Sequence, residues 1–530
     1  MRKRAFQQVL LATLVAGSSL SGRQTNAPII DLGYSQYQGV FDANNNVTNF
    51  LGLRYAAAPT GENRWRAPQA PQNTSGVQLA NANPRPCFSA PTGAAPSNPF
   101  LKNNKRQTIA KGEDCLFLNI AFPGSTVPSE GLPTVIWIHG GGYIAGSISS
   151  FQLADLVRES NQGVVVVAIQ YRLGLFGFLS GNKVKENGDL NAGLLDQNFA
   201  FRWVREHISK FGGDPNKVTI WGESAGAGAV LQHIIAEDGK TNPQLFRGAI
   251  TSSTFLPSQY MFNDPLPEAL YSEAVSQTNC SQSSDTMACL RAADAQVLQK
   301  ANEDINVAGF FGTFPFVPVV DGTFIKQRAT KVLKQGTVNG QALLAVSNAN
   351  EGQVFVNQSA PANVRDFVGQ LFPTLGPQQE LAVTRQYNGL GSQLNQENLV
   401  MGESIFVCPT YFLLNAFRSR SFKGVFAIDP ALHGQDVNYY LPFGRPPPFN
   451  NTDFVKAFSQ SFLSFVISLD PNVKFDSSNI TPHWKLYNEG ETEMVFNRTG
   501  DAPDVHTVTT DCEFRKRCSF WESLSTLTAQ

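Results

Sequence analysis

The chain has 530 residues, of which 42% are hydrophobic and 16% charged, with a formal net charge of −1 at pH 7. The charged fraction lies below the roughly 25% usual for soluble domains, and the near-neutral balance gives no basic footprint for a nucleic acid partner. Length alone suggests about three domains, while the apolar content permits one large core.

Residues 1–22 have the pattern of a secretory signal peptide. A basic start at residues 2–4 precedes an apolar run at residues 9–16 and then small residues. The run is too short to span a bilayer, and the alternative is a packed or disordered N-terminal helix. No later stretch is expected to reach transmembrane length. The sequence therefore predicts a secreted, extracellular protein whose fold begins near residue 23 and which has no stable membrane anchor.

The cysteines and the glycosylation sequons agree with export. No cysteine pair has the close spacing of a zinc site or a redox dithiol, so in a secreted chain the cysteines predict up to three disulfides and one free thiol. The seven cysteines are Cys87, Cys115, Cys280, Cys289, Cys408, Cys512 and Cys518. Sequons that predict a glycoprotein begin at Asn46, Asn73, Asn279, Asn357, Asn450, Asn479 and Asn497.

Short apolar runs rich in β-branched residues recur along the chain. They are TVIWI (134–138), VVVVAI (164–169), VTIW (218–221), ALLAV (342–346) and GVFAI (424–428). Because they do not alternate polar with apolar residues, we expect strands buried on both faces. Helical patterns lie between them, the clearest at residues 191–211. The sequence predicts an α/β fold whose central, mostly parallel sheet is covered by helices on both faces.

The first run leads into the glycines Gly140, Gly141 and Gly142. Consecutive glycines let the main chain approach a substrate oxygen and point N–H groups at it. The alternatives are a flexible loop or a phosphate cradle, and the Lys-Ser/Thr ending of a phosphate loop is absent. We expect an oxyanion-binding loop, with the N–H group of Ala225 as a further donor.

The third run is followed by GESAG at residues 222–226. The bare G-x-S-x-G pattern is expected by chance in roughly one of four such chains. Here a strand precedes it and a helix-forming stretch follows, which is the context of a nucleophile elbow. The sequence thus predicts that Ser224 is a nucleophile, and a serine nucleophile needs a base and an acid that orients the base.

Six histidines compete for the role of base. His433 follows the last of the buried runs, where α/β enzymes place catalytic groups, and it fits the chain order serine, acid, histidine. The acid should lie between the two, and Glu351 follows another buried run. Asp321 and Asp429 remain competitors, although both can be turn residues.

Longer motifs resemble the type-B carboxylesterase and lipase family, the cholinesterase-like branch of the α/β hydrolases, in its secreted fungal form. FGGDPNKVTIWGESAG (211–226) is similar to the serine signature of the family, and EDCLFLNI (113–120) to its second signature. FLGLRYAAAPTGENRWRAP, IQYRLGLFGFL, FVPVVDG, NEG and HGQD match in order. The resemblance covers residues 30–521.

The resemblance implies the α/β-hydrolase fold and one catalytic domain over residues 23–530. It implies a catalytic triad of Ser224, Glu351 and His433, with no metal or cofactor. It also implies an oxyanion hole formed by the N–H groups of Gly141, Gly142 and Ala225, and the disulfides Cys87–Cys115, Cys280–Cys289 and Cys408–Cys518, with Cys512 left free.

The leading hypothesis is a monomeric, secreted carboxylic ester hydrolase that acts on small or medium uncharged esters. The alternatives are a lipase or sterol esterase acting on long-chain lipid esters, and a non-catalytic adhesion protein on the same scaffold. The loop at residues 88–114 contains no Trp for a cation–π site and no clear amphipathic helix for a large lid. We expect FFGTFPF (310–316) and RPPPF (445–449) to line the rim of an apolar pocket.

Overall fold

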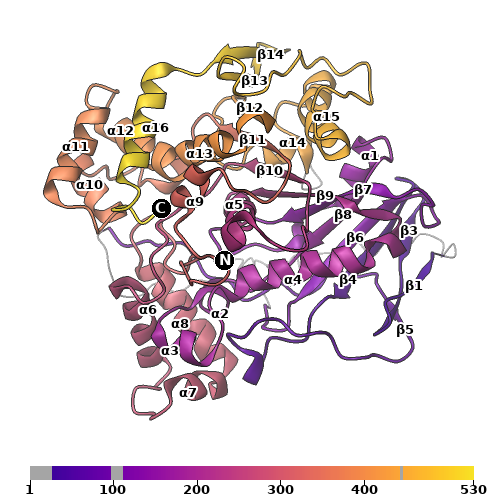
Figure 1. Cartoon of the computed structure of the whole chain (residues 1–530), viewed down its shortest axis with the longest axis horizontal. Coiled ribbons are helices and arrows are strands. Elements are labelled where there is room, and N and C mark those ends of the chain that lie inside the picture. The colour runs from indigo at the N-terminus through magenta and orange to yellow at the C-terminus, as the bar shows by residue number, and fades with distance from the viewer. Residues whose placement is uncertain (1–26, 97–110, 442–445) are drawn as a thin grey trace, which may run out of the picture.

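The computed structural model describes residues 27–96, 111–441 and 446–530 (Figure 1). The expected signal peptide, residues 1–22, lies outside the described residues, as do residues 97–110 of the loop at 88–114.

Within the described residues, eleven strands form one sheet in the order β14-β13-β12-β11-β10-β9-β7-β8-β6-β4-β3. These strands are β3 (Val40–Asp42), β4 (Val47–Arg54), β6 (Phe117–Pro123), β7 (Leu132–Ile138), β8 (Val165–Ile169), β9 (Gly213–Glu223), β10 (Gly248–Ser252), β11 (Ala342–Asn348), β12 (Ser421–Phe426), β13 (Thr492–Thr499) and β14 (Ala502–Thr509). A second sheet has the order β1-β2-β5, with β1 (Ile29–Asp31), β2 (Gln36–Gln38) and β5 (Val77–Leu79).

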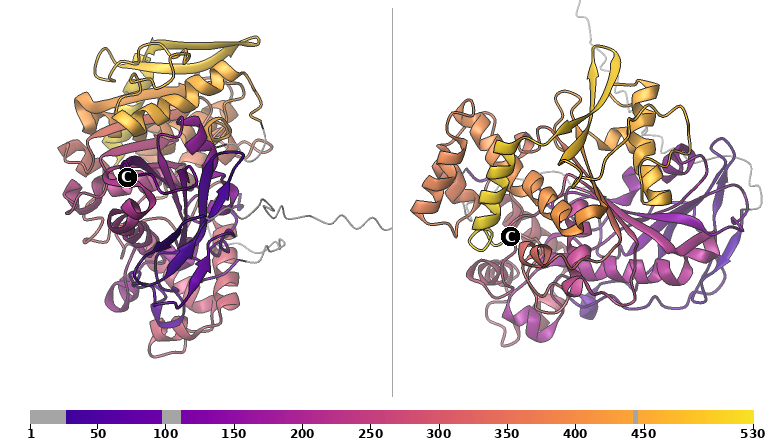
Figure 2. Two further views of the ribbon diagram at one scale, coloured as in Figure 1. Left: turned by 90° about the vertical axis from the view of Figure 1, so that its right-hand side faces the viewer. Right: turned by 45° about the horizontal axis from the view of Figure 1, so that its top comes forward.

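The centre of the large sheet is parallel, as the sequence predicts. Every neighbouring pair from β8 through β7, β9, β10, β11 and β12 to β13 is parallel. The pairs β3–β4, β4–β6, β6–β8 and β13–β14 at the two edges are antiparallel. The β13–β14 hairpin lies at one edge of the sheet, in yellow beside α15 (Thr452–Ser468) (Figure 2).

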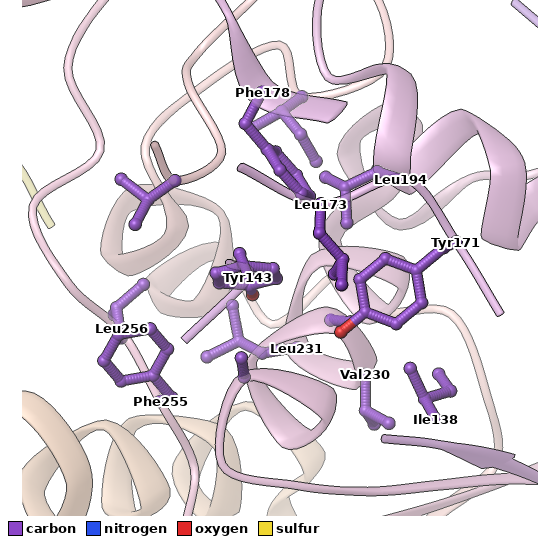
Figure 3. Packing of buried hydrophobic residues seen from close by; sticks show 14 of the residues in the cluster. Ile138, Tyr143, Tyr171, Leu173, Phe178, Leu194, Val230, Leu231, Phe255 and Leu256 are labelled. Atoms are coloured by element: carbon purple, nitrogen blue, oxygen red, sulfur yellow. The ribbon is translucent and has the colours of Figure 1, made fainter. Parts of the chain in front are cut away.

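Helices cover both faces of the sheet, and the apolar strands supply side chains to two cores. Val135 and Trp137 of β7 pack in a core with α1 (Leu153–Glu159) and α15. Ile136 and Ile138 of the same strand pack in the larger core with α4 (Ala192–His207) and α5 (Ala225–Gly239). Figure 3 shows part of the larger core. This two-sided burial explains why the runs are continuously apolar.

The remaining helices lie largely in insertions between strands. After β8 come α2 (Gly174–Phe178) and α3 (Asn182–Asn187); after β10 come α6 (Pro265–Gln277), α7 (Thr286–Ala292), α8 (Ala295–Ala308) and α9 (Ala329–Gln335). After β11 come α10 (Val364–Leu371), α11 (Pro377–Tyr387), α12 (Gln393–Gly402) and α13 (Cys408–Phe417), and after β12 comes α14 (Val437–Tyr440). The chain ends in α16 (Cys512–Leu524), which packs beside α13.

Helix α4 agrees with the predicted helical stretch at residues 191–211. Its last turn continues as a 3₁₀ turn, Ile208–Phe211, and Gly212 ends it with a φ of 78°. A left-handed glycine of this kind is the usual helix terminator, because it meets no Cβ penalty.

Three disulfides join Cys87 to Cys115, Cys280 to Cys289 and Cys408 to Cys518. They are the same three pairs that the family resemblance implies, and Cys512 is free and exposed.

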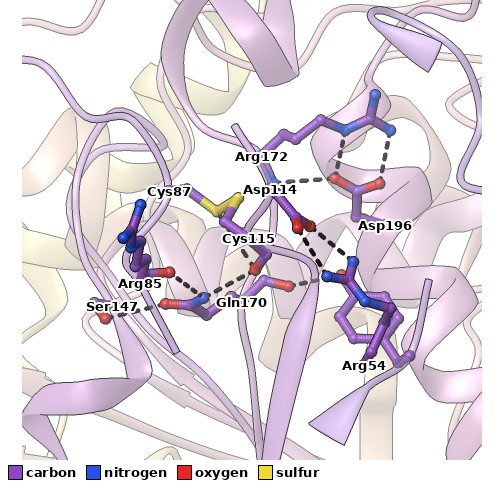
Figure 4. The surroundings of a disulfide bond; sticks show 10 residues. Arg54, Arg85, Cys87, Asp114, Cys115, Ser147, Gln170, Arg172 and Asp196 are labelled. Atoms are coloured by element: carbon purple, nitrogen blue, oxygen red, sulfur yellow. Dashed lines mark hydrogen bonds and ion pairs between the residues drawn. A yellow bond between two sulfur atoms is a disulfide. The ribbon is translucent and has the colours of Figure 1, made fainter. Parts of the chain in front are cut away.

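Polar contacts hold the segments around Cys87–Cys115 together (Figure 4). The Gln170 amide donates to the Cys115 carbonyl at 2.9 Å. The Arg172 guanidinium binds both carboxylate oxygens of Asp196 at 2.7 Å, and the two side chains are 3% and 0% exposed. In this bidentate geometry two charge-assisted hydrogen bonds join the guanidinium to the carboxylate, so each buried charge has a partner.

The expectation that no later stretch reaches transmembrane length needs a correction. The continuous helix Gln393–Arg420 is long and apolar enough to cross a membrane by length and composition alone, but 83% of its most apolar window is buried inside the protein. Length and composition do not separate a core helix from a membrane span, and here the burial identifies a core helix.

Asp196→Ala should destabilise the fold strongly. It leaves the Arg172 guanidinium buried without its carboxylate, which typically costs about 3–5 kcal/mol in the free energy of unfolding. Urea denaturation measures the change. The control is Lys183→Ala, which removes an exposed ion pair with Glu186 and should leave the midpoint unchanged. Equal stability of the Asp196→Ala protein and its parent would contradict this role for the pair.

Candidate active site

Ser224 lies at the sharp turn between β9 and α5, as the elbow pattern predicts. Its φ of 56° and ψ of −124° belong to neither strand nor helix. The Ser224 N–H donates to the Ser252 carbonyl on β10 at 2.9 Å. This contact fixes the turn against the neighbouring strand, and the side chain lies at the carboxyl end of the sheet.

The glycines beside Ser224 are required by close backbone packing. A Cβ on Gly226 would lie 2.0 Å from the Ile138 carbonyl oxygen at the end of β7, and one on Gly222 would lie 2.3 Å from the Gly226 backbone. Larger residues would push the elbow off the sheet. The two glycines of the G-x-S-x-G pattern are therefore needed because main-chain segments approach each other closely at the elbow.

The loop after β7 packs on the elbow from the other side. A Cβ on Gly140 would lie 3.0 Å from the Ser224 Cβ. Gly141 and Gly142 have φ values of 109° and 63°, in the region that glycine adopts without strain. Ala225 is the first residue of α5, where N–H groups have no intrahelical acceptor. Within the described residues, the N–H groups of Gly141, Gly142 and Ala225 donate to no backbone carbonyl.

Glu351 and His433 meet at the carboxyl ends of β11 and β12. The Glu351 Oε2 atom is 2.6 Å from the His433 Nδ1 atom. The second oxygen, Oε1, accepts from the Asn348 N–H at 2.7 Å. Glu351 is 2% exposed. Both carboxylate oxygens thus have partners, which fixes the direction in which Glu351 meets the imidazole.

Aromatic rings hold His433 from the sides. Its ring centroid lies 4.6 Å from that of Phe406 and 4.9 Å from that of Phe355. Among the residues that the structure describes, the Nε2 atom has no hydrogen-bond partner, and the Glu223 Oε1 atom lies 3.3 Å from it. Because Glu223 directly precedes Ser224, the unpartnered nitrogen lies beside the elbow.

Three carboxyl groups, those of Glu351, Glu223 and Asp436, lie close to the imidazole. Burial raises the pKa of Glu223 to about 8 and that of Asp436 to about 6. Burial by itself lowers the pKa of His433, but the charges of Glu351, Glu223 and Asp436 together outweigh it and raise that pKa above its ordinary value of 6.5. An uncharged imidazole therefore requires a higher pH than usual.

Three of the competing residues, His139, His233 and Asp321, have structural roles. His139 stacks on Tyr171, and burial lowers the pKa of His139 to about 4. His233 contacts the Gln197 amide oxygen at 3.0 Å, and burial lowers its pKa to about 3. Asp321 accepts from the N–H groups of three following residues, as a turn aspartate does.

An apolar cavity of about 140 Å³ is lined in part by residues that pack on the glycine loop and on His433. Phe314 forms part of its wall and also packs where a Cβ of Gly142 would stand, 2.1 Å away. Phe355 and Phe406, which flank His433, line it as well. Its far walls come from the inserted helices α6, α8, α10 and α12. The cavity thus begins beside the oxyanion loop and the imidazole.

Of the two expected rim segments, only FFGTFPF (310–316) lines this cavity. The expectation for RPPPF (445–449) was wrong in its described part. Phe449 is buried against Phe454 of α15, with ring centroids 5.4 Å apart, in the core on the other face of the sheet. An aromatic residue after a proline run can either pack in a core or line a pocket. Which of these it does depends on the tertiary structure and not on the local sequence.

Sequence reasoning missed Glu223, Asp436 and Phe406. A signal existed for the two acids, because Glu223 lies inside the serine pattern and Asp436 inside HGQD. Phe406 had none, since it lies 27 residues from His433 in an apolar stretch.

A mostly parallel sheet, a serine at a strand-to-helix turn and a histidine–carboxylate pair at the same sheet edge define an α/β hydrolase of the serine esterase type. The model of the Carboxylesterase family matches residues 27–521. The chain therefore belongs to that family and is a serine carboxylic ester hydrolase. The fold class and enzyme class that the sequence predicts are confirmed.

Known relatives extend over nearly the whole chain. Lipase 1 of Geotrichum candidum is 28% identical over 91% of this chain and 93% of its own length. The secreted lipase of Arthroderma benhamiae is 28% identical over 98% of this chain and 97% of its own length. The crystal structure of Aspergillus niger EstA matches with a TM-score of 0.84 at 28% identity, covering 95% of this chain and 99% of that one.

Gly226→Ala should displace the elbow and lower activity. The new Cβ would lie 2.0 Å from a backbone oxygen, so the chain itself must move, and a displacement of about 1 Å at a reacting group costs roughly a hundredfold in rate. Hydrolysis of a nitrophenyl ester measures the effect. Gly112→Ala is the control, because a Cβ there meets open space. Parental activity in Gly226→Ala would disprove the close approach.

Proposed function

We propose that Ser224 is the nucleophile of this esterase, His433 its general base and Glu351 the acid that orients the base. The observation that carries the assignment is the 2.6 Å contact between Glu351 and the His433 Nδ1 atom, which leaves the Nε2 atom unpartnered beside the elbow. An imidazole held at one nitrogen and open at the other is arranged to take a proton from the serine hydroxyl.

The reaction then follows from the positions of these groups. The Ser224 Oγ atom attacks the ester carbonyl while the His433 Nε2 atom takes its proton, and Glu351 stabilises the imidazolium. The N–H groups of Gly141, Gly142 and Ala225 bind the oxyanion of the tetrahedral intermediate. His433 returns the proton to the leaving alcohol, and water then releases the acid from Ser224 by the same steps in reverse.

The apolar cavity supports a short or medium uncharged acyl group as the preferred substrate. Its volume of about 140 Å³ is below the roughly 300–1,000 Å³ of sites for drug-sized ligands. Phe314, Phe355 and Phe406 are among its lining residues, so the acyl chain would lie among aromatic rings. A long-chain lipid ester is the second candidate, because two of the relatives reported above are lipases.

We propose further that the enzyme is monomeric, with one catalytic domain over residues 23–530, and that it is secreted. Three disulfides suit an oxidising compartment, and one relative is a secreted lipase. The sequon residues Asn46, Asn73 and Asn450 are themselves exposed. Asn479 is 5% exposed and its side chain accepts from the Thr481 N–H, so we expect no glycan there.

Hydrolysis of nitrophenyl esters of about two to about eighteen acyl carbons should separate the two substrate classes. We expect the fastest turnover on short or medium chains and complete loss of activity in Ser224→Ala. An optimum at long chains would favour the lipase. Residual activity of Ser224→Ala at the parental level would refute the assignment of the nucleophile.

The pH dependence should report the charge on His433. Catalysis needs the uncharged imidazole, and the pKa of His433 is raised above 6.5. We therefore expect kcat/KM to fall as the pH drops through a midpoint above that value. Asp436→Asn should move the midpoint to lower pH, because the pKa of Asp436 is about 6, so Asp436 is mostly ionised at that midpoint and its charge raises the pKa of His433. A profile without an acid limb between about pH 4 and pH 8 would contradict the role of His433.

A further inference from the structure

The helix that borders the active site is interrupted by one π-helical turn. Helices α12 and α13 are joined by the turn Glu403–Val407, in which the Cys408 N–H donates to the Glu403 carbonyl. Pro409 follows directly. Since proline has no N–H, it cannot donate to the Ile405 carbonyl as an α-helix would require. π-helical turns are rare and are often found at functional sites.

The carbonyl groups that the turn releases have partners in the pocket wall and near the chain end. The Ile405 carbonyl accepts from the Leu256 N–H at 2.9 Å, and Leu256 follows Phe255 of the cavity wall. The Ser404 carbonyl accepts from the Gln530 amide at 2.9 Å. Both released carbonyl groups, those of Ser404 and Ile405, thus accept hydrogen bonds from outside the helix.

The side chain that the turn presents to the active site is Phe406. Its ring packs on His433 and stacks on Phe355 and Phe255, at 5.0 and 5.4 Å between centroids. One hydrogen bond to Glu351 fixes a single nitrogen of the imidazole, about which the ring can still tilt. Phe406 and Phe355 restrict that tilt, so they control where the Nε2 atom points.

Both ends of the π-helical turn are fastened to consecutive residues of α16. At its start, Glu403 accepts from the Arg517 Nε and Nη2 atoms at 2.8 and 2.7 Å, and from the Tyr387 hydroxyl at 2.7 Å. At its end, Cys408 forms the disulfide with Cys518. The Glu403 and Arg517 side chains are 6% and 15% exposed. We call these two links the 403–408 clamp.

We propose that the 403–408 clamp positions the general base: by fixing the π-helical turn it holds Phe406 against His433 and aims the Nε2 atom at Ser224. The proposal rests on the proposed function, since it takes His433 as the base. Glu403 and Arg517 are therefore positioning residues, which act on catalysis through Phe406 and touch no reacting atom.

Loosening the clamp has a consequence that simple loss of stability does not have. Burial lowers the pKa of His433, and the charges of Glu351, Glu223 and Asp436 raise it. If Phe406 withdraws, water reaches the imidazole and weakens both the effect of burial and the effect of the carboxyl charges. Because the charges outweigh burial, the pKa of His433 falls back toward its ordinary value of 6.5. The acid limb of the pH–rate profile then moves to lower pH.

The decisive variants are Arg517→Met and Phe406→Leu, each alone and both together. Arg517→Met keeps the length of the side chain and removes its charge. Arg515→Met is the matched control, because Arg515 lies on the same helix and pairs with the partly exposed Glu491. Glu403→Gln serves as a second variant if Arg517→Met does not fold. Thermal unfolding and pH profiles of kcat and KM are measured for all.

We expect Arg517→Met and Phe406→Leu each to lower kcat about tenfold with KM little changed, and to move the acid limb to lower pH. The double variant should be no slower than Phe406→Leu alone, since both act through one contact. Arg515→Met should match the parent. If the losses in kcat multiply in the double variant, or if the variants lose stability with an unchanged acid limb, the clamp has only a structural role and the proposal is wrong. A parent without any acid limb would overturn the proposed function itself.

Discussion

The approach of two main chains at the ends of β7 and β9 is the constraint on which the active site depends. Gly226 packs on the Ile138 carbonyl, and Gly140 packs on Ser224, so the strained turn and the oxyanion loop support each other without intervening side chains. The two strands are parallel neighbours, and the sheet therefore delivers both segments to one edge. Strain at such a turn persists only where the surrounding structure holds it.

Charge is the second organising feature. His433 lies among Glu351, Glu223 and Asp436 in a site from which water is largely excluded. Three ionised carboxylates so close together would repel strongly, and burial keeps Glu223 and Asp436 partly protonated by raising each pKa. Glu351 differs from them in position, because one of its oxygens contacts the His433 Nδ1 atom and the other accepts from the Asn348 N–H. The environment thus gives similar side chains different roles, as in other acid–base sites.

The aromatic cavity connects this chemistry to specificity. Phe406 belongs both to the cavity wall and to the surroundings of His433, so the segment that shapes the proposed acyl site also contacts the proposed general base. Its position depends on Pro409, on the released carbonyls and on contacts with α16. Residues far apart in the chain are therefore coupled mechanically, through packed side chains, rather than by direct contact with a substrate.

The sequence by itself determined the parallel α/β sheet, the elbow, the glycine loop and the order of Ser224, Glu351 and His433. These features depend on local rules, because buried strands need continuous apolar runs and close backbone contacts need glycine. Only the tertiary structure decided that Glu351 rather than Asp321 meets the imidazole, that Phe314 lines the cavity while Phe449 does not, and that Gln393–Arg420 is a core helix. The physical reason is that those outcomes depend on which distant segments pack together. Residue type and local spacing do not specify such long-range packing.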